Sequence, residues 1–104
     1  MDMKKLMKQA QQMQKMMDEM EEKLKNTVVE ASVGGGMVNV KMNGKYEVVD
    51  ITVSEEILKN EEPVVITDLL KSAFNEAKNK VDILNREEMA KITGGIQLPN
   101  MLGF

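Results

Sequence analysis

The first residues of the chain carry a local excess of positive charge. Residues 1–17 contain four lysines and one aspartate. On a helix the lysines take the heptad positions b, c, f and f, and they are Lys4, Lys5, Lys8 and Lys15. Ammonium groups gathered on one helix face suit contact with the phosphates of a polyanion. A plain solvated helix face is the other interpretation of the same lysines.

The remainder of the chain does not share this excess. Residues 28–62 contain three lysines and seven acids, and the whole chain has a net charge of −3. Nucleic-acid-binding domains usually have a basic balance, so binding here requires the positive charge to be segregated on the N-terminal residues. The three aromatic residues, Tyr46, Phe74 and Phe104, are too few for a protein that stacks the bases of single strands.

The composition does not favour an enzyme. The chain has no histidine and no cysteine, which removes the usual general base, thiolate metal ligands and disulfides. The acid pairs Glu55–Glu56 and Glu61–Glu62 fall in loops and helix starts, where carboxylates favour the helix dipole. We therefore expect no catalytic residue, no metal and no other cofactor. With no apolar run long enough for a bilayer, we expect no membrane partner and a cytoplasmic location.

The glycine run 34–36 could cradle a phosphate. Phosphate-binding loops of that kind open a helix, whose N-terminal amides bind the anion. Here the pattern predicts a strand after the glycines, so we expect a turn between two strands.

A long helix must present the N-terminal lysines. Residues 3–25 contain no Gly, Pro or β-branched residue and are rich in strong helix formers. Apolar residues recur at positions a and d of unbroken heptads, namely Met3, Leu6, Ala10, Met13, Met17, Met20 and Leu24. Such a narrow stripe favours a facing helix. At about 34 Å, the helix has to project from the domain or pair.

Three strands follow. The alternation of apolar residues predicts strands over 28–33, 37–42 and 45–53. Asn43-Gly44 predicts a two-residue type I′ hairpin turn between the last two. The apolar phase slips by one at Val48-Val49, which indicates either a β-bulge or a strand buried on both sides there.

Two further helices complete the pattern. A short helix is expected over 55–59, and a long one over 64–92. The first half of the long helix has a broad apolar face for the sheet, and the second half should extend past it. Gly94-Gly95 is typical of a helix end. Residues 96–104 form an apolar, proline-interrupted tail that is either docked or disordered.

The expected fold class is α+β, arranged α-β-β-β-α around a three-stranded antiparallel meander, in a single domain over residues 1–104. Three strands cannot cover two helices of this length. A homodimer would bury the surface that one chain leaves in water.

The ordered set of motifs resembles the YbaB/EbfC family of bacterial nucleoid-associated proteins. The motifs are residues 6–14 (LMKQAQQMQ), 36–44 (GMVNVKMNG), 51–53 (ITV), 69–77 (LLKSAFNEA) and 89–91 (MAK), with Gly94-Gly95 and Leu98-Pro99. The likeness is collinear over nearly the whole chain, without a large insertion.

The resemblance implies a homodimer whose long helices protrude like the arms of tweezers. It implies binding to double-stranded DNA, with effects on DNA conformation, nucleoid organisation and gene expression. The family's DNA contacts lie on the terminal helices. The basic residues of those helices in this sequence are Lys4, Lys5, Lys8, Lys15, Lys23, Lys25, Lys71, Lys78, Lys80, Lys91 and Arg86. The selected candidates are Lys4, Lys5, Lys8, Lys15, Lys78, Lys80 and Arg86, and the first four rank highest. The alternative is an adaptor that binds other proteins through its Met-rich first helix and has little affinity for DNA.

Overall fold

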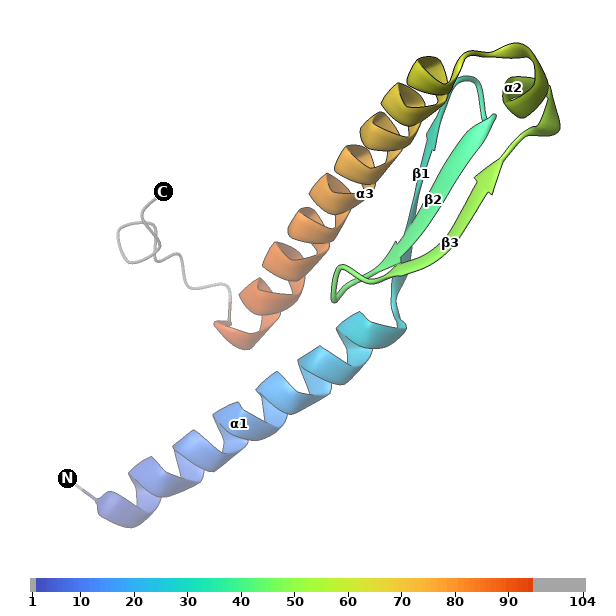
Figure 1. The fold of residues 1–104 in the computed structure, drawn as a ribbon. Coiled ribbons are helices and arrows are strands. Elements are labelled where there is room, and N and C mark those ends of the chain that lie inside the picture. The colour runs from blue at the N-terminus through green and yellow to red at the C-terminus, as the bar shows by residue number, and fades with distance from the viewer. Residues whose placement is uncertain (1, 95–104) are drawn as a thin grey trace.

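The computed structural model describes residues 2–94 and confirms the α+β class. The elements in order are α1 (Met3–Asn26), β1 (Val28–Val33), β2 (Val38–Asn43), β3 (Val48–Val53), α2 (Glu55–Asn60) and α3 (Pro63–Ile92) (Figure 1). The expected helices and the first strand agree with these bounds to within a residue or two. Ser54 caps α2, since its hydroxyl accepts a hydrogen bond from the amide of Ile57 at 3.3 Å.

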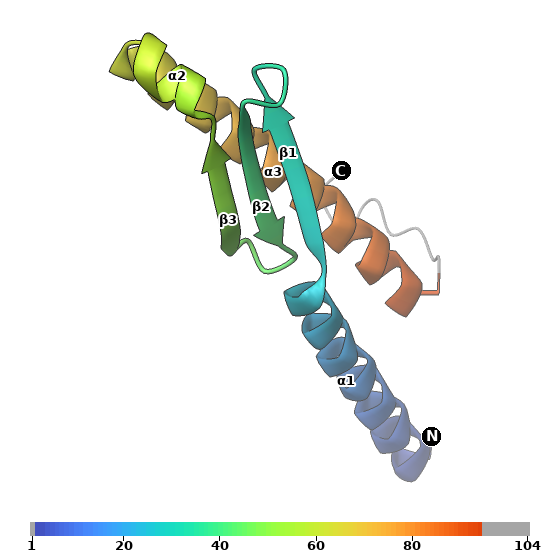
Figure 2. The same ribbon diagram turned by 90° about the vertical axis from the view of Figure 1, so that its right-hand side faces the viewer.

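The sheet is an antiparallel meander in the order β1-β2-β3 (Figure 2). The turn between β1 and β2 consists of the glycine run, as expected. Gly34, Gly35 and Gly36 all have positive φ, a backbone region that residues other than glycine rarely adopt. These glycines therefore shape a tight connection between strands and do not open a helix.

The second hairpin differs from the prediction. β3 begins at Val48 and not at residue 45, and the residue with positive φ is Tyr46. The carbonyl of Asn43 accepts from the amide of Tyr46 at 3.1 Å, and its amide donates to Glu47 at 2.9 Å. This is a three-residue loop, so the predicted type I′ turn is wrong. The Asn43 side chain drives the change, because its oxygen accepts from the amides of Lys45 and Glu47.

The predicted bulge is confirmed. Lys41 of β2 pairs with Asp50, whereas the next residue, Met42, pairs with Val48. Val49 is therefore the extra residue, and it restores the phase of the apolar side chains after the slip.

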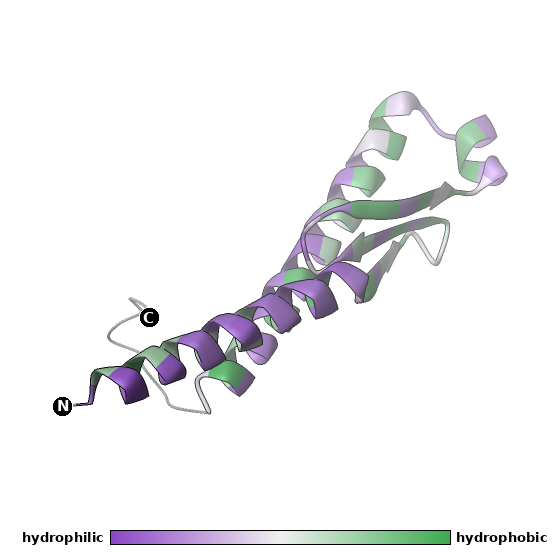
Figure 3. Cartoon of the chain, turned by 90° about the horizontal axis from the view of Figure 1, so that it is seen from below, coloured by the Kyte–Doolittle hydropathy of each residue, from purple (hydrophilic) through white to green (hydrophobic). Residues whose placement is uncertain are grey.

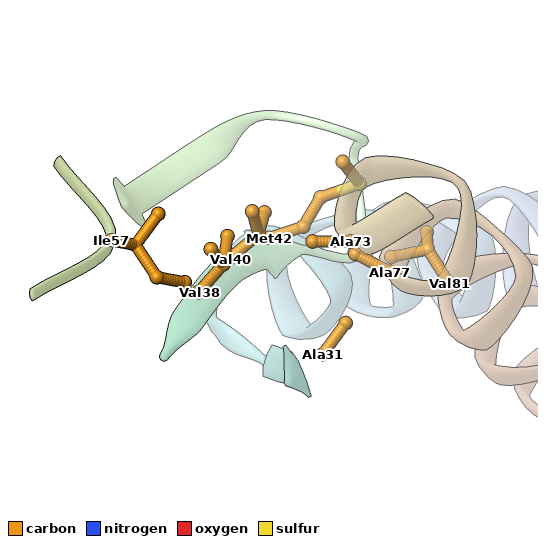
Figure 4. Close-up of a cluster of buried hydrophobic side chains, with 8 residues drawn as sticks. All are labelled: Ala31, Val38, Val40, Met42, Ile57, Ala73, Ala77 and Val81. Carbon is orange, nitrogen blue, oxygen red and sulfur yellow. The ribbon is translucent and has the colours of Figure 1, made fainter. Parts of the chain in front are cut away.

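The core lies between the sheet and α3. α3 crosses β1 and β2, and its small residues Ala73 and Ala77 allow the helix to lie close to the strands. The buried cluster comprises Ala31, Val38, Val40, Met42, Ile57, Ala73, Ala77 and Val81 (Figure 4). The second half of α3 continues past the sheet, as the narrowing of its apolar face predicted. There it meets α1, a contact that the sequence did not predict.

One flank of the sheet is left uncovered. By register, Val48 and Ile51 of β3 lie on the same face as the buried Met42 and Val40 of β2. α3 does not reach over β3 (Figure 1), and Ile51 remains 45% exposed. Apolar side chains in this position would be stabilised by a further layer.

The molecule is long for its size. Its Cα radius of gyration is 19.3 Å, with extents of 69 × 27 × 17 Å, whereas a compact chain of this length has about 13 Å. The large radius of gyration comes from α1, which is attached to the body only at the C-terminal end of the helix and projects away from it (Figures 1 and 2). Gly94, with φ +68°, ends α3 as expected. Gly95 and the tail 96–104 lie outside the described residues.

Candidate nucleic-acid interface

The N-terminal part of α1 projects as an arm, which we define as residues 3–15. Every residue of the arm is exposed, and burial in α1 is confined to Met20 and Leu24. Asp2 starts the helix, because its carboxylate accepts from the Lys4 amide at 3.0 Å. This cap was missed in the sequence, although an aspartate one residue before an unbroken helical pattern is the signal for it.

The apolar heptad stripe of α1 has no facing helix along the arm in the described part of the chain. Leu6 and Met13 are 41% and 47% exposed, whereas Leu24 at the base is 1% exposed. Apolar residues recur along α1 between hydrophilic ones (Figure 3). The apolar stripe thus lacks a packing partner only along the arm. At the base of α1 the body of the molecule buries Met20 and Leu24.

A glycine in the second hairpin fixes the base of the arm. The amide of Gly44 donates to the carbonyls of Leu24 at 2.8 Å and Thr27 at 3.0 Å. The side-chain amide of Asn85 on α3 donates to the Gly44 carbonyl at 3.0 Å. A Cβ added at Gly44 would lie 2.6 Å from the Leu24 carbonyl oxygen. We call these four residues the arm joint, since they connect α1, the hairpin and α3.

A charged cluster supports the joint on its α3 side. Glu88 is buried, and its carboxylate lies 3.0 Å from the Lys23 ammonium and 2.8 Å from the Lys91 ammonium. Hydrogen bonds from Lys91 and then Lys23 hold the pKa of Glu88 below its ordinary value. The Glu88 carboxylate in turn raises the pKa of Lys91. Lys23 of α1 therefore holds α1 against α3, whereas the Lys91 contact lies within α3. Both lysines are less available for an external anion.

The arm lysines differ from these. All four are exposed, and none forms an ion pair with another described residue. The acids of α1 are concentrated farther along the helix, where Glu21 pairs with Lys45 at 2.9 Å and Asp18 accepts from Gln14 at 2.9 Å. The arm is thus a positively charged helical segment, and the acidic residues Asp18, Glu19, Glu21 and Glu22 lie between it and the body.

The three α3 candidates are not brought to the arm. Lys78 pairs with Asp82 at 2.8 Å, and Asp82 also accepts from the Tyr46 hydroxyl. The hydrogen bonds from Lys78 and Tyr46 lower the pKa of Asp82. The hydrogen bond to Asp82 raises the pKa of Tyr46. Lys80 donates to the backbone carbonyl of Glu30 at 2.6 Å on the β1 side.

Arg86 has no ion pair within residues 2–94. Of the three α3 candidates it is therefore the most available for an external anion, since Lys78 and Lys80 are already bound within the body.

Other kinds of site find no support in residues 2–94. No group of three or more acids that could hold a metal ion occurs there. Within the same residues, neither long helix is apolar enough over a bilayer's width to cross a membrane. A helical arm with free ammonium groups is suited to electrostatic contact with a polyanion, and phosphate contacts of this kind position a protein without reading sequence.

Comparison with known proteins points the same way. The model of the YbaB/EbfC DNA-binding family matches residues 1–96. A nucleoid-associated protein of Ruminiclostridium cellulolyticum is 46% identical over 101 residues, covering 96% of this chain and 88% of its own length. One from Desulfotalea psychrophila is 36% identical and covers 100% of this chain and 98% of its own.

A solved structure shares the fold. The crystal structure of an uncharacterized protein from Helicobacter pylori matches with a TM-score of 0.74 and 33% sequence identity. The match covers 86% of this chain and 94% of the other.

Proposed function

This chain belongs to the YbaB/EbfC DNA-binding family of nucleoid-associated proteins, and from that premise we propose that its two arms, one from each copy of a homodimer, hold double-stranded DNA. The four lysines of each arm contact phosphates on the duplex. The observation that carries the proposal is that Lys4, Lys5, Lys8 and Lys15 are exposed on a projecting helix, without carboxylate partners among residues 2–94.

The homodimer is supported by the uncovered flank of the sheet. Val48 and Ile51 of β3 expose apolar surface, and Leu70 and Phe74 of α3 are only half-buried although they pack against the core. A second copy placed on this flank by a two-fold axis would cover the same residues on both chains, as an isologous interface requires. The two arms would then project from one body.

The binding mode follows from charge. The arm lysines contact phosphates, so sequence preference is broad and affinity falls steeply with salt as counterions are released. Arg86 adds a contact from α3, with smaller contributions from Lys78 and Lys80 because these already have partners. We place the protein with the cytoplasmic nucleoid, where two arms on one duplex change its conformation and thereby affect gene expression.

A gel shift tests the arm. Replacing Lys4, Lys5, Lys8 and Lys15 by Glu should abolish the shift of a random duplex at low salt. A control with the same change in charge replaces Lys25, Lys41, Lys59 and Lys71, which lie off the arm. This control should retain most of the binding. If both variants bind as the unmodified protein does, the arm is not the DNA-binding element.

The exposed stripe of the arm favours a second candidate, an adaptor for another protein. Met3, Leu6 and Met13 present flexible apolar side chains of the kind used by adaptable binding surfaces. A pull-down from nuclease-treated lysate separates the two functions. Retained protein partners together with no binding to purified duplex would favour the adaptor, and binding to purified duplex would favour the DNA clamp.

A further inference from the structure

One apolar line on α1 runs from the exposed arm into the base. Leu6, Met13 and Met20 are spaced by seven residues, so they lie nearly above one another on the helix. Met16 lies beside this line and is exposed as well. We call Leu6, Met13, Met16 and Met20 the α1 seam. Its outer part has no cover among residues 2–94, whereas Met20 is buried against the body.

The seam opens into a groove where α1 meets α3. The groove has a volume of about 190 Å³. Met16, Met20 and Ile92 form its apolar lining, and its charged lining comes from Glu19, Lys23, Glu88 and Lys91. Ile92 is the last residue of α3. The chain therefore leaves α3 at the inner end of the seam.

The residues that follow suit this surface. Gly94 has φ +68°, which turns the chain out of the helical direction. Residues 95–104 contain Ile96, Leu98, Met101, Leu102 and Phe104 and no charged side chain.

Length also permits the contact. Ten extended residues reach up to about 33 Å. The helix rises about 21 Å from Met20 to Leu6. The segment can thus run the full length of the seam from the point where α3 ends.

We propose that residues 95–104 fold back along the α1 seam of the same chain and form the missing apolar cover of the arm. The segment enters through the groove beside Ile92 and runs toward Leu6. The arm lysines occupy positions b, c and f, on the side of the helix away from this line. Docking therefore leaves the ammonium groups free. The proposal concerns the protein without DNA and does not depend on the proposed function.

Tethering favours this occupant over the α1 of a second copy. A segment attached two residues beyond the groove has an effective concentration in the millimolar range. A second α1 packed along the seam would instead join the two arms into one coiled coil. The two occupants predict different contacts, so an experiment can separate them.

Paramagnetic broadening tests the contact directly. The chain contains no cysteine, so Asn100→Cys carries a single nitroxide label on the segment, and methyl-labelled methionines report from α1. The methyl signals of Met13 and Met16 should lose most of their intensity and recover it when the nitroxide is reduced. The same label at Asn60→Cys, at the end of α2, is the control and should leave these signals unchanged.

Two further samples complete the test. Changing Leu98, Met101, Leu102 and Phe104 to Ser beside the label at position 100 should restore the Met13 and Met16 signals. A mixture of spin-labelled chains with methyl-labelled chains should show no broadening, because the contact lies within one chain. Broadening in the mixture would show that the segment of one chain covers the seam of a second copy, and would overturn docking within one chain. Full intensity in the Asn100→Cys sample would overturn the docking altogether.

Discussion

At the residue scale, the lysines of this chain divide by whether a protein oxygen already holds them. Lys78 and Lys80 on α3 are bound to Asp82 and to the Glu30 carbonyl. Lys23 and Lys91 share the buried Glu88. The arm lysines face only solvent in the described chain. Free ammonium groups retain their full attraction for phosphate, so the arm is the part of the surface best suited to a polyanion.

The Glu88 cluster predicts a pH dependence of stability. Because its folded-state pKa lies below the ordinary value of 4.5, ionised Glu88 stabilises the fold above that pH. This stabilisation is lost as the pH falls through the depressed pKa. Glu88→Gln should therefore be less stable than the unmodified protein at pH 7, and the gap should narrow on acidification. Urea unfolding of both proteins at pH 7 and at acidic pH measures the difference in their free energies of unfolding.

The exposed neighbour Glu87 provides the control for that comparison. Glu87→Gln removes the same charge without touching the Lys23 and Lys91 contacts. A stability gap for Glu88→Gln that stays constant as the pH falls, or that Glu87→Gln reproduces, would argue against the cluster as its source.

The helix cap predicts local order in the arm. Asp2→Ala removes the acceptor for the Lys4 amide and should destabilise the first turn by about 0.5–2 kcal/mol. Amide hydrogen exchange in residues 4–6 should then be faster. Asp2→Ser is the matched control, because it loses the same charge but keeps a capping oxygen. Equal exchange in the two variants would show that the cap does not order the arm.

At the element scale, the direction of α1 depends on the arm joint. Gly44 is required there because of space and not because of its φ, since a Cβ would lie 2.8 Å from the Leu24 Cβ and 2.6 Å from the Leu24 carbonyl oxygen. The backbone of α1 or of the hairpin has to move to admit a side chain. A small shift at the base is magnified along the length of the arm.

Gly44→Ala should therefore both destabilise the fold and redirect the arm. The expected cost is about 1–3 kcal/mol, as for other overpacked sites, and urea unfolding measures it. Spin labels at residues 8 and 71 report the distance between α1 and α3, which should change. Gly35→Ala strains a turn with no atom within 4 Å of its Cβ, so it should leave that distance unchanged. If Gly44→Ala leaves the distance between the two labels as unchanged as Gly35→Ala does, the arm joint does not set the direction of α1.

Much at the element scale could be predicted from the sequence because it is set by local spacing. The long helices, the glycine turn and the bulge at Val49 follow from periodicity and from the phase of apolar residues. The loop type of the second hairpin could not be predicted, although the hairpin itself was. Its loop depends on the Asn43 side chain and on Gly44 packing against Leu24, a residue twenty positions earlier.

The candidate site divides in the same way. The arm lysines follow from spacing on one helix, since no distant residue competes for them in the described chain. The reduced availability of Lys80 depends on the carbonyl of Glu30, fifty residues away in the sequence. Lys23 likewise depends on Glu88 of α3. Such contacts arise only after the chain has folded, so they leave no local pattern.

At the scale of the whole molecule, one chain leaves apolar surface uncovered in its described part. It is elongated, with an uncovered apolar flank on β3 and an arm that stands clear of the body. A dimer through the flank would place two charged arms on one particle. Bivalent attachment then raises the avidity of weak phosphate contacts without adding any new kind of contact.

The flank predicts the oligomeric state. Ile51→Lys places a charge among the apolar residues of β3 and should convert a dimer into a monomer in sedimentation at micromolar concentration. Thr52→Lys is the matched control, because Thr52 pairs with Asn39 and points to the opposite face of the sheet. It should remain dimeric. A monomeric mass for the unmodified protein would refute the dimer.

The most direct test of the arm as the DNA-binding element is the salt dependence of binding to a random duplex. Each phosphate neutralised contributes about −0.9 to the slope of log Kobs against log salt. Changing Lys4, Lys5, Lys8 and Lys15 to Gln removes four lysines from each copy. In a dimer the slope should become shallower by up to about 7, whereas the control at Lys25, Lys41, Lys59 and Lys71 should keep the original slope. A slope that the arm substitutions leave unchanged would contradict phosphate binding by the arms.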